Sequence, residues 1–210
     1  MRSLLFGGAV VATGGYGCVF TYMHKTLGDC VGKVNFLDPM WMENEDASPE
    51  KFRAIQNMIF RLDPEEKYFI TVRDIVKFSS THEDISKCVA LYNERWKGRN
   101  IKFKKGQILD AYIQRRVDPA PPISEWTPEQ KQHALNGMKL LHMNNLCHND
   151  IALQNFGFRN GLPVYIDMDG AWEDKELTLS SRRNGRITLS TFGSRYDDVE
   201  ALKQVFNGDR

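Results

Sequence analysis

The chain has 210 residues, of which 41% are hydrophobic, a composition that supports a packed core and excludes a disordered protein. Its 28 basic and 27 acidic residues leave a formal net charge of +1, so no global field draws it to nucleic acid or to an anionic membrane. Any polyanion that binds this protein must therefore contact a local patch of basic residues. The four cysteines form no CxxC pair and have no zinc-ligand spacing, which indicates reduced thiols. We expect a cytoplasmic protein with neither nucleic acid nor a membrane as its partner.

The N-terminal third predicts three antiparallel strands. Apolar residues up to Ala12 superficially resemble a signal peptide, but glycines interrupt them and a first strand fits better. Alternating apolar residues and turn signals then predict two further strands, over residues 18–24 and 30–36. No later segment approaches the roughly 20 apolar residues of a membrane-spanning helix.

The middle of the chain predicts a helix and the rest of the sheet. Ser48-Pro49 and an apolar stripe up to Ile59 predict a helix that ends at Asp63-Pro64. Residues 67–76 and 101–113 are rich in β-branched and aromatic residues, which is typical of strands, and residues 83–96 are helical or irregular.

A proline-rich stretch over residues 118–124 indicates a boundary between two lobes, because proline is excluded from helix interiors and central strands. We assign residues 1–113 to the first lobe and 114–210 to the second. In the second lobe, Thr127-Pro128-Glu129-Gln130 forms a capping box that begins a long helix leading to His148. A strand over 163–167 and a helix over 196–206 follow.

A glycine-rich turn separates the first two predicted strands. Glycines there let backbone N–H groups approach a polyphosphate closely, although a simple tight turn is the alternative. Lys33 on the third strand favours phosphate binding, because its ammonium group can pair with phosphate oxygens. We expect a β-branched residue at Gly15 or Gly17 to weaken nucleotide affinity more than stability. The residues expected to bind the nucleotide here are Ala12, Gly14, Gly15, Tyr16, Gly17, Val19 and Lys33.

A second motif lies in the loop that starts at His148. Asp150 and Asn155 fit the pattern H-x-D-x-x-x-x-N, in which the acid orients an attacking hydroxyl and the amide oxygen binds Mg²⁺. Asp167 ends a strand a dozen residues later and is also suited to bind Mg²⁺. For an isolated Asp or Asn in a loop, turn capping would be the alternative interpretation.

The order and spacing of these motifs resemble the protein-kinase superfamily over nearly the whole chain. The resemblance implies an α+β, two-lobed fold with a reduced helical second lobe. It implies that ATP and Mg²⁺ are the cofactors, that Asp150, Lys33 and Asn155 are catalytic, and that Asn155 and Asp167 hold the metal. Glu50 is the candidate partner of Lys33, although the helix dipole also favours a carboxylate in a first turn.

Two stretches refine this resemblance. "GGYGCVF" and "IFRLDPEEKYFI" are similar to divergent kinases of large DNA viruses, which implies a viral protein in the host cytoplasm. Residues 194–202 are similar to the helix after the activation segment of casein-kinase-I-like enzymes. In that alignment Asp198 is the buried carboxylate that ties this helix to the catalytic loop.

The sequence also departs from the family pattern. Asn149 replaces the arginine of HRD, which implies activity without phosphorylation of residues 176–194. Ala152 replaces the lysine usual in serine/threonine kinases, and Asp169 replaces the glycine of DFG, as in some sugar and choline kinases.

We predict transfer of the γ-phosphoryl group of ATP to Ser/Thr hydroxyls of protein substrates. The alternatives are a small-molecule phosphotransferase of the same fold and a nucleotide-binding pseudokinase. Small-molecule kinases normally add a helical insert, for which this chain has no room. We also expect a partner or self-association to complete the short second lobe.

Overall fold

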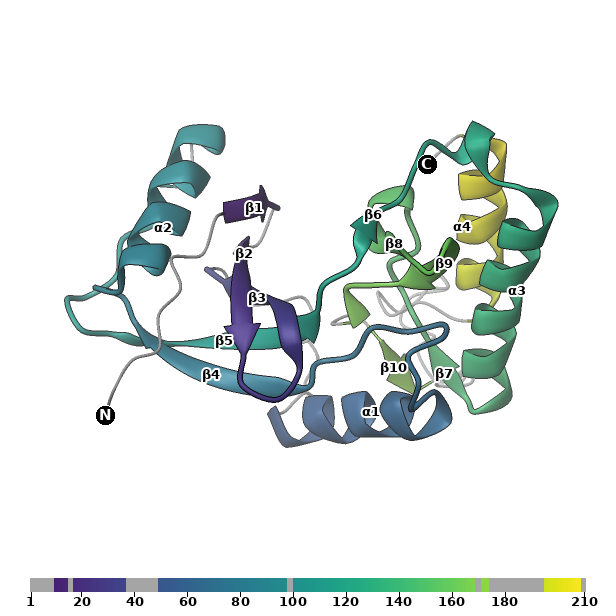
Figure 1. Cartoon of the computed structure of the whole chain (residues 1–210), viewed down its shortest axis with the longest axis horizontal. Helices are drawn as coiled ribbons and strands as arrows, with labels where there is room; N and C mark the ends of the chain where they lie inside the picture. The colour runs from purple at the N-terminus through teal and green to yellow at the C-terminus, as the bar shows by residue number, and fades with distance from the viewer. Residues whose placement is uncertain are drawn as a thin grey trace, which may run out of the picture. The chain divides into compact units, whose positions relative to one another are not determined.

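The computed structural model shows an α+β protein (Figure 1). It describes residues 10–14, 17–36, 49–97, 100–168, 171–173 and 195–208. These residues contain a five-stranded antiparallel sheet and four α-helices. The chain divides into two compact units. The first unit is Met1–Asp46 with Val72–Arg116, and the second is Ala47–Thr71 with Val117–Arg210.

The first unit is built on the five-stranded sheet, whose strand order is β1-β2-β3-β5-β4. Every neighbouring pair is antiparallel. The strands are β1 (Val10–Thr13), β2 (Gly17–His24), β3 (Gly28–Asn35), β4 (Asp74–Ser79) and β5 (Ile108–Arg115). The strands predicted over residues 18–24 and 30–36 are therefore confirmed.

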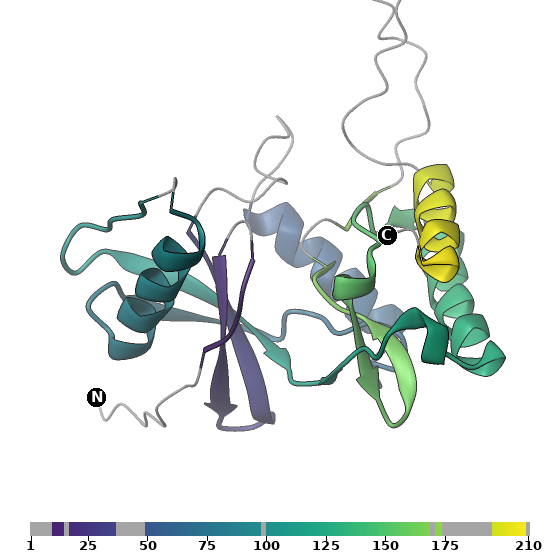
Figure 2. The same ribbon diagram turned by 90° about the horizontal axis from the view of Figure 1, so that it is seen from above.

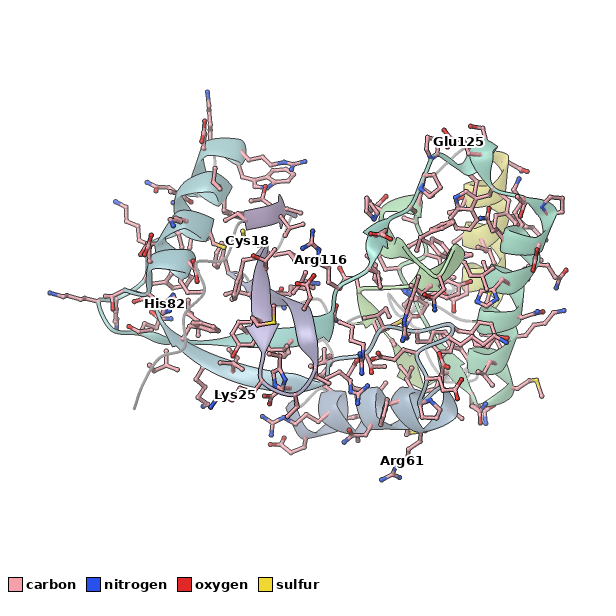
Figure 3. All side chains as sticks on the ribbon, viewed as in Figure 1. Cys18, Lys25, Arg61, His82, Arg116 and Glu125 are labelled. Atoms are coloured by element: carbon pink, nitrogen blue, oxygen red, sulfur yellow. The ribbon has the colours of Figure 1, made fainter. Side chains whose placement is uncertain are left out.

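One face of this sheet packs against helix α2 (Glu83–Arg95). Phe20 and Val34 of the sheet share one buried core with Ile85 and Tyr92 of the helix. Figure 3 labels Cys18 on β2 and His82 at the start of α2. Because side chains alternate along a strand, Lys33 points to the face opposite Val34 and its core.

The second unit combines helices with two small sheets. Its helices are α1 (Pro49–Leu62), α3 (Pro128–Met143) and α4 (Arg195–Asn207), with short 3₁₀ turns η2 (Ile123–Glu125) and η3 (Leu153–Asn155). Its strands are β6 (Asp118–Pro119), β7 (Leu146–Cys147), β8 (Phe156–Arg159), β9 (Leu162–Tyr165) and β10 (Trp172–Glu173). Strand orders are β6-β8-β9 and β10-β7. Figures 1 and 2 show α3 and α4 side by side.

The capping box predicted for α3 is confirmed. The Thr127 hydroxyl accepts a hydrogen bond from the Gln130 N–H at 3.2 Å, and the Gln130 side chain accepts one from the Thr127 N–H at 2.8 Å. The helix therefore starts where the sequence predicts, and it ends just before the turn that leads through β7 to His148.

The predicted strand over residues 67–76 is only partly correct. Its second half becomes part of β4, but its first half lies in the second unit. The Asp63 carboxylate accepts hydrogen bonds from the N–H groups of residues 67, 68 and 69 at 2.9, 2.6 and 2.9 Å. Ile70 N–H then donates to the Tyr165 carbonyl at 2.9 Å. These N–H groups are therefore already hydrogen-bonded and do not pair with a strand of the first unit's sheet.

Helix α1 also groups with the second unit, whereas the sequence placed it in the first lobe with a boundary after residue 113. The buried Gln56 side chain explains this grouping, because its amide donates to the Met168 carbonyl at 2.8 Å. No helix in the described part of the chain is long and apolar enough to cross a membrane.

Candidate active-site loop and glycine-rich turn

The carboxylate of Asp198 on α4 holds the loop that starts at His148. It is 1% exposed and accepts hydrogen bonds from the main-chain N–H groups of His148 at 2.8 Å and Asn149 at 2.9 Å. The His142 ring at the end of α3 lies 3.1 Å from the same carboxylate. The predicted tie between α4 and this loop is therefore confirmed.

His148 links both ends of the site through its buried ring. Nδ1 lies 3.3 Å from the Asp150 N–H, which can only donate, so this ring nitrogen is the acceptor. Nε2 lies 3.2 Å from the Ile166 carbonyl, which can only accept. One neutral tautomer, with the proton on Nε2, satisfies both bonds. The ring thus fixes the main chain of Asp150 relative to the residue before Asp167.

Asn155 contacts Asp150 directly. Its amide group lies 2.8 Å from the Asp150 carbonyl and 2.7 Å from Asp150 Oδ2. Both Asp150 oxygens are hydrogen-bond acceptors, so the NH₂ end of the Asn155 amide faces them and the amide oxygen points elsewhere. Asn155 is buried, whereas Asp150 is exposed. The Asn155 contact thus involves only Oδ2 of an exposed Asp150.

The hairpin β8–β9 brings Asp167 back to Asn155. Its register pairs Phe156 with Tyr165, and the Ile166 N–H donates to the Asn155 carbonyl at 2.9 Å. Asp167 is therefore one residue beyond the partner of Asn155, which explains why the two are a dozen positions apart. Asp167 has φ +56°, a left-handed conformation that Asp tolerates better than most residues.

Sequence reasoning missed three side chains that hold this site: His142, His148 in its role as a bridge, and Gln56. Gln56 carried a detectable signal, since it is a polar residue beside the apolar stripe of a predicted helix. His142 lies in the last turn of the long helix predicted before His148, and no local pattern there indicates its contact with Asp198. The bridge made by His148 depends on a hydrogen bond across 18 residues, which no local pattern predicts.

The glycine-rich turn lies in the first unit. Gly14 N–H donates to the Gly17 carbonyl at 2.9 Å, while Gly15 and Tyr16 lie outside the described residues. A Cβ on Gly17 would lie 2.0 Å from the Val34 carbonyl oxygen, whereas one on Gly14 would meet nothing within 4 Å. Packing against β3 therefore also requires glycine at position 17, and the expectation that replacing Gly17 affects nucleotide affinity more than stability stays a prediction.

Three predicted nucleotide-binding residues lie in one row across the sheet. The register pairs Ala12 with Val19, Val19 with Lys33, and Lys33 with Tyr112 of β5. Directly paired residues share a sheet face, so these side chains are neighbours on the face opposite α2. Glu50 is exposed in the first turn of α1. Because Glu50 belongs to the second unit and Lys33 to the first, their pairing stays a prediction.

The oxygen atoms that could act as metal ligands near Asp150 suit a hard cation. The amide oxygen of Asn155 and the carboxylate of Asp167 are oxygen ligands of the type that Mg²⁺ prefers, and Mg²⁺ usually takes its remaining ligands from phosphates and water. The two residues present therefore fit Mg²⁺ bound together with a nucleotide. Within the described residues, no group of three or more His, Cys, Asp or Glu side chains is arranged to hold a metal.

Comparison with protein-family models finds no match to this chain, and comparison with curated proteins finds no match either. Two predicted features lie outside the described residues: Asp169, which replaces the glycine of DFG, and residues 176–194, whose phosphorylation is expected not to be needed for activity.

Proposed function

We propose that this protein is an ATP- and Mg²⁺-dependent protein kinase with a kinase-like two-lobed fold, which phosphorylates Ser/Thr hydroxyls of protein substrates. The observation that carries the proposal is the contact between Asp150 and Asn155, together with the hairpin that returns Asp167 to Asn155. An acid, an amide and a second acid are thus held in one small region by buried hydrogen bonds.

Asp150 is the residue that orients the acceptor hydroxyl. The Asn155 amide binds Asp150 Oδ2, which leaves Oδ1 to accept the hydroxyl proton. The hydroxyl oxygen forms a bond to the γ-phosphorus, the bond from that phosphorus to the β–γ bridging oxygen breaks, and ADP leaves with the electron pair. Asp150 is exposed, which supports an acceptor carried on a protein surface.

The other predicted residues hold the nucleotide. Lys33 pairs with its phosphate oxygens, and backbone N–H groups of the glycine-rich turn bind the same phosphates. Asn155 Oδ1 and the Asp167 carboxylate are the Mg²⁺ ligands. When bound, Mg²⁺ neutralises charge that develops on the transferred phosphoryl group.

The test is transfer of label from γ-labelled ATP to a mixture of protein acceptors and, separately, to small hydroxyl compounds. We expect labelled protein, and we expect Asp150→Asn to lower the rate by about 10²–10⁴-fold, the usual contribution of a positioned general base. Labelling of small compounds alone would favour the small-molecule kinase. Nucleotide binding without any transfer would favour the pseudokinase.

A further inference from the structure

A strongly basic segment of the first unit begins at the last residue of α2 and ends before β5. Residues 95–105 include six of the 28 basic residues of the chain and none of its 27 acidic residues. The rest of the chain therefore has 22 basic and 27 acidic residues and is acidic. A nearly neutral protein thus concentrates positive charge in one short segment.

Hydrogen bonds hold residues 101–104 of this segment along α2. The Asn93 side chain donates to the Ile101 carbonyl at 2.9 Å and accepts from the Ile101 N–H at 2.7 Å. Near the other end of the helix, the Ser80 hydroxyl donates to the Lys104 carbonyl at 2.8 Å. Residues 101–104 therefore run antiparallel to α2.

Side chains alternate along this segment. Ile101 and Phe103 pack against the core of the first unit, whereas Lys102 and Lys104 are exposed. Alternate residues of an extended chain are about 6.6–7 Å apart. A peptide with acidic residues at every second position can therefore match the two ammonium groups.

Four described lysines of the segment have no ion-pair partner among the described residues. Lys97, Lys102, Lys104 and Lys105 are exposed, and none forms an ion pair with a carboxylate in the part of the chain that the structure describes. Other lysines of the same unit do form such pairs: Lys87 lies 2.6 Å from Glu83 and Lys77 lies 4.0 Å from Asp110. The charge of these four lysines is thus available to another molecule.

We propose that the four exposed lysines of this segment, Lys97, Lys102, Lys104 and Lys105, form a docking surface for an acidic segment of a partner protein, a role that goes beyond the proposed catalytic function and does not depend on it. An acidic peptide fits better than nucleic acid, because single-stranded nucleic acid is usually bound by exposed aromatic side chains on which bases stack. The aromatic residues of this segment, Trp96 and Phe103, instead pack against the core.

The experiment measures binding of a fluorescein-labelled peptide with glutamate at every second position, by fluorescence anisotropy. The test variant is Lys102→Gln/Lys104→Gln. The control is Lys25→Gln/Lys139→Gln, which changes net charge equally at exposed sites: Lys25 lies in the β2–β3 turn (Figure 3) and Lys139 lies on α3. Thermal unfolding shows that both variants fold, and a single-stranded oligonucleotide and phosphatidylserine vesicles are tested in parallel.

We expect saturable, salt-sensitive peptide binding that the test variant weakens by roughly five- to tenfold, consistent with the loss of two surface ion pairs. The control variant should change the affinity less than twofold. Failure of the peptide to bind at low salt, or an equal loss in both variants, would overturn the proposal. Tighter binding of the oligonucleotide or the vesicles would do the same, since it would assign the segment to a different partner.

Discussion

The Asp198 carboxylate accepts the main-chain N–H of His148 across 50 residues, at 2.8 Å. The helix near the end of the described chain thus sets the position of the loop that contains Asp150. The carboxylate is almost completely buried, so if it were removed by mutation, water would not replace it as the acceptor for these N–H groups.

The Asp198→Ala variant tests this relationship. It leaves the buried N–H of His148, the partly buried N–H of Asn149 and the His142 ring without this acceptor, so we expect a loss of about 3 kcal/mol in the free energy of unfolding and a strong loss of phosphoryl transfer. The control is Glu200→Ala on the same helix, which removes only a surface ion pair with Lys203 at 2.7 Å and should cost less than about 1 kcal/mol. Equal stability of the two variants in urea denaturation would contradict the role of Asp198.

The glycine-rich turn gives a matched pair of substitutions. Gly17→Ala should lower stability by about 1–3 kcal/mol, because its Cβ has no room against the main chain of β3. Gly14→Ala should leave stability within about 0.5 kcal/mol, because its Cβ meets open space. Thermal unfolding measures both. Calorimetric titration of Gly14→Ala with ATP then tests nucleotide binding, where we expect a weaker affinity. An unchanged affinity would mean that this turn is not a phosphate-binding loop.

Asn155→Asp is a nearly isosteric test of the Asp150 contact. It replaces the donating NH₂ group by an oxygen and places two carboxylates about 2.7 Å apart, the distance that now separates the amide nitrogen from Asp150 Oδ2. Repulsion should displace Asp150, and we expect kcat to fall by at least about 10²-fold. Circular dichroism checks that the fold is retained. Near-normal turnover would show that the amide hydrogen bond does not position Asp150.

The buried Tyr165 phenol makes stability depend on pH in the alkaline range. Burial, with a smaller effect of the Asp198 carboxylate, raises the pKa of Tyr165 well above its ordinary value of 10.0. The unfolded chain loses this proton near pH 10 while the folded chain keeps it. Stability is therefore fully present below pH 10 and falls as the pH rises above it. Tyr165→Phe should flatten this fall, as measured by urea denaturation below and above pH 10.

The same substitution has a cost at neutral pH. The Tyr165 hydroxyl donates to the Ala134 carbonyl at 2.9 Å, and losing this bond should reduce stability by about 1 kcal/mol. Tyr22→Phe, in the first unit, is the comparison for the alkaline effect: burial also raises the pKa of Tyr22, so its removal should flatten a separate part of the fall. If Tyr165→Phe kept the full alkaline slope, its phenol would not be the group responsible.

The four cysteines should be unreactive in the folded protein. All are buried. The hydrogen bond with Cys18, together with burial, raises the pKa of the Cys88 thiol, whereas the same hydrogen bond lowers the pKa of Cys18, so burial is what shields the Cys18 sulfur from reagents. Only a thiolate reacts readily with a disulfide reagent, so we expect no rapid labelling in the native state and four labelled thiols in denaturant. A fast-reacting native thiol, located by mass spectrometry, would contradict the burial of that cysteine.

Local patterns were sufficient for the elements whose signals lie within a few residues. The capping box at Thr127, the apolar stripe of α1 and the alternation in β2 and β3 each depend on neighbouring side chains, and the structure has these elements where they were predicted. The spacing between Asp150 and Asn155 could also be interpreted from the sequence, because it lies within one loop.

Tertiary structure alone decided where several of these elements pack and what some residues do. Residues 67–70 have the composition of a strand of the first sheet, but the Asp63 carboxylate and the Tyr165 carbonyl bind their N–H groups in the second unit. Gly17 matched a phosphate loop, yet its need for glycine comes from the β3 backbone beside it. In each case the deciding partner is distant in sequence, and the free energy of satisfying buried hydrogen bonds and avoiding overlap outweighs local propensity.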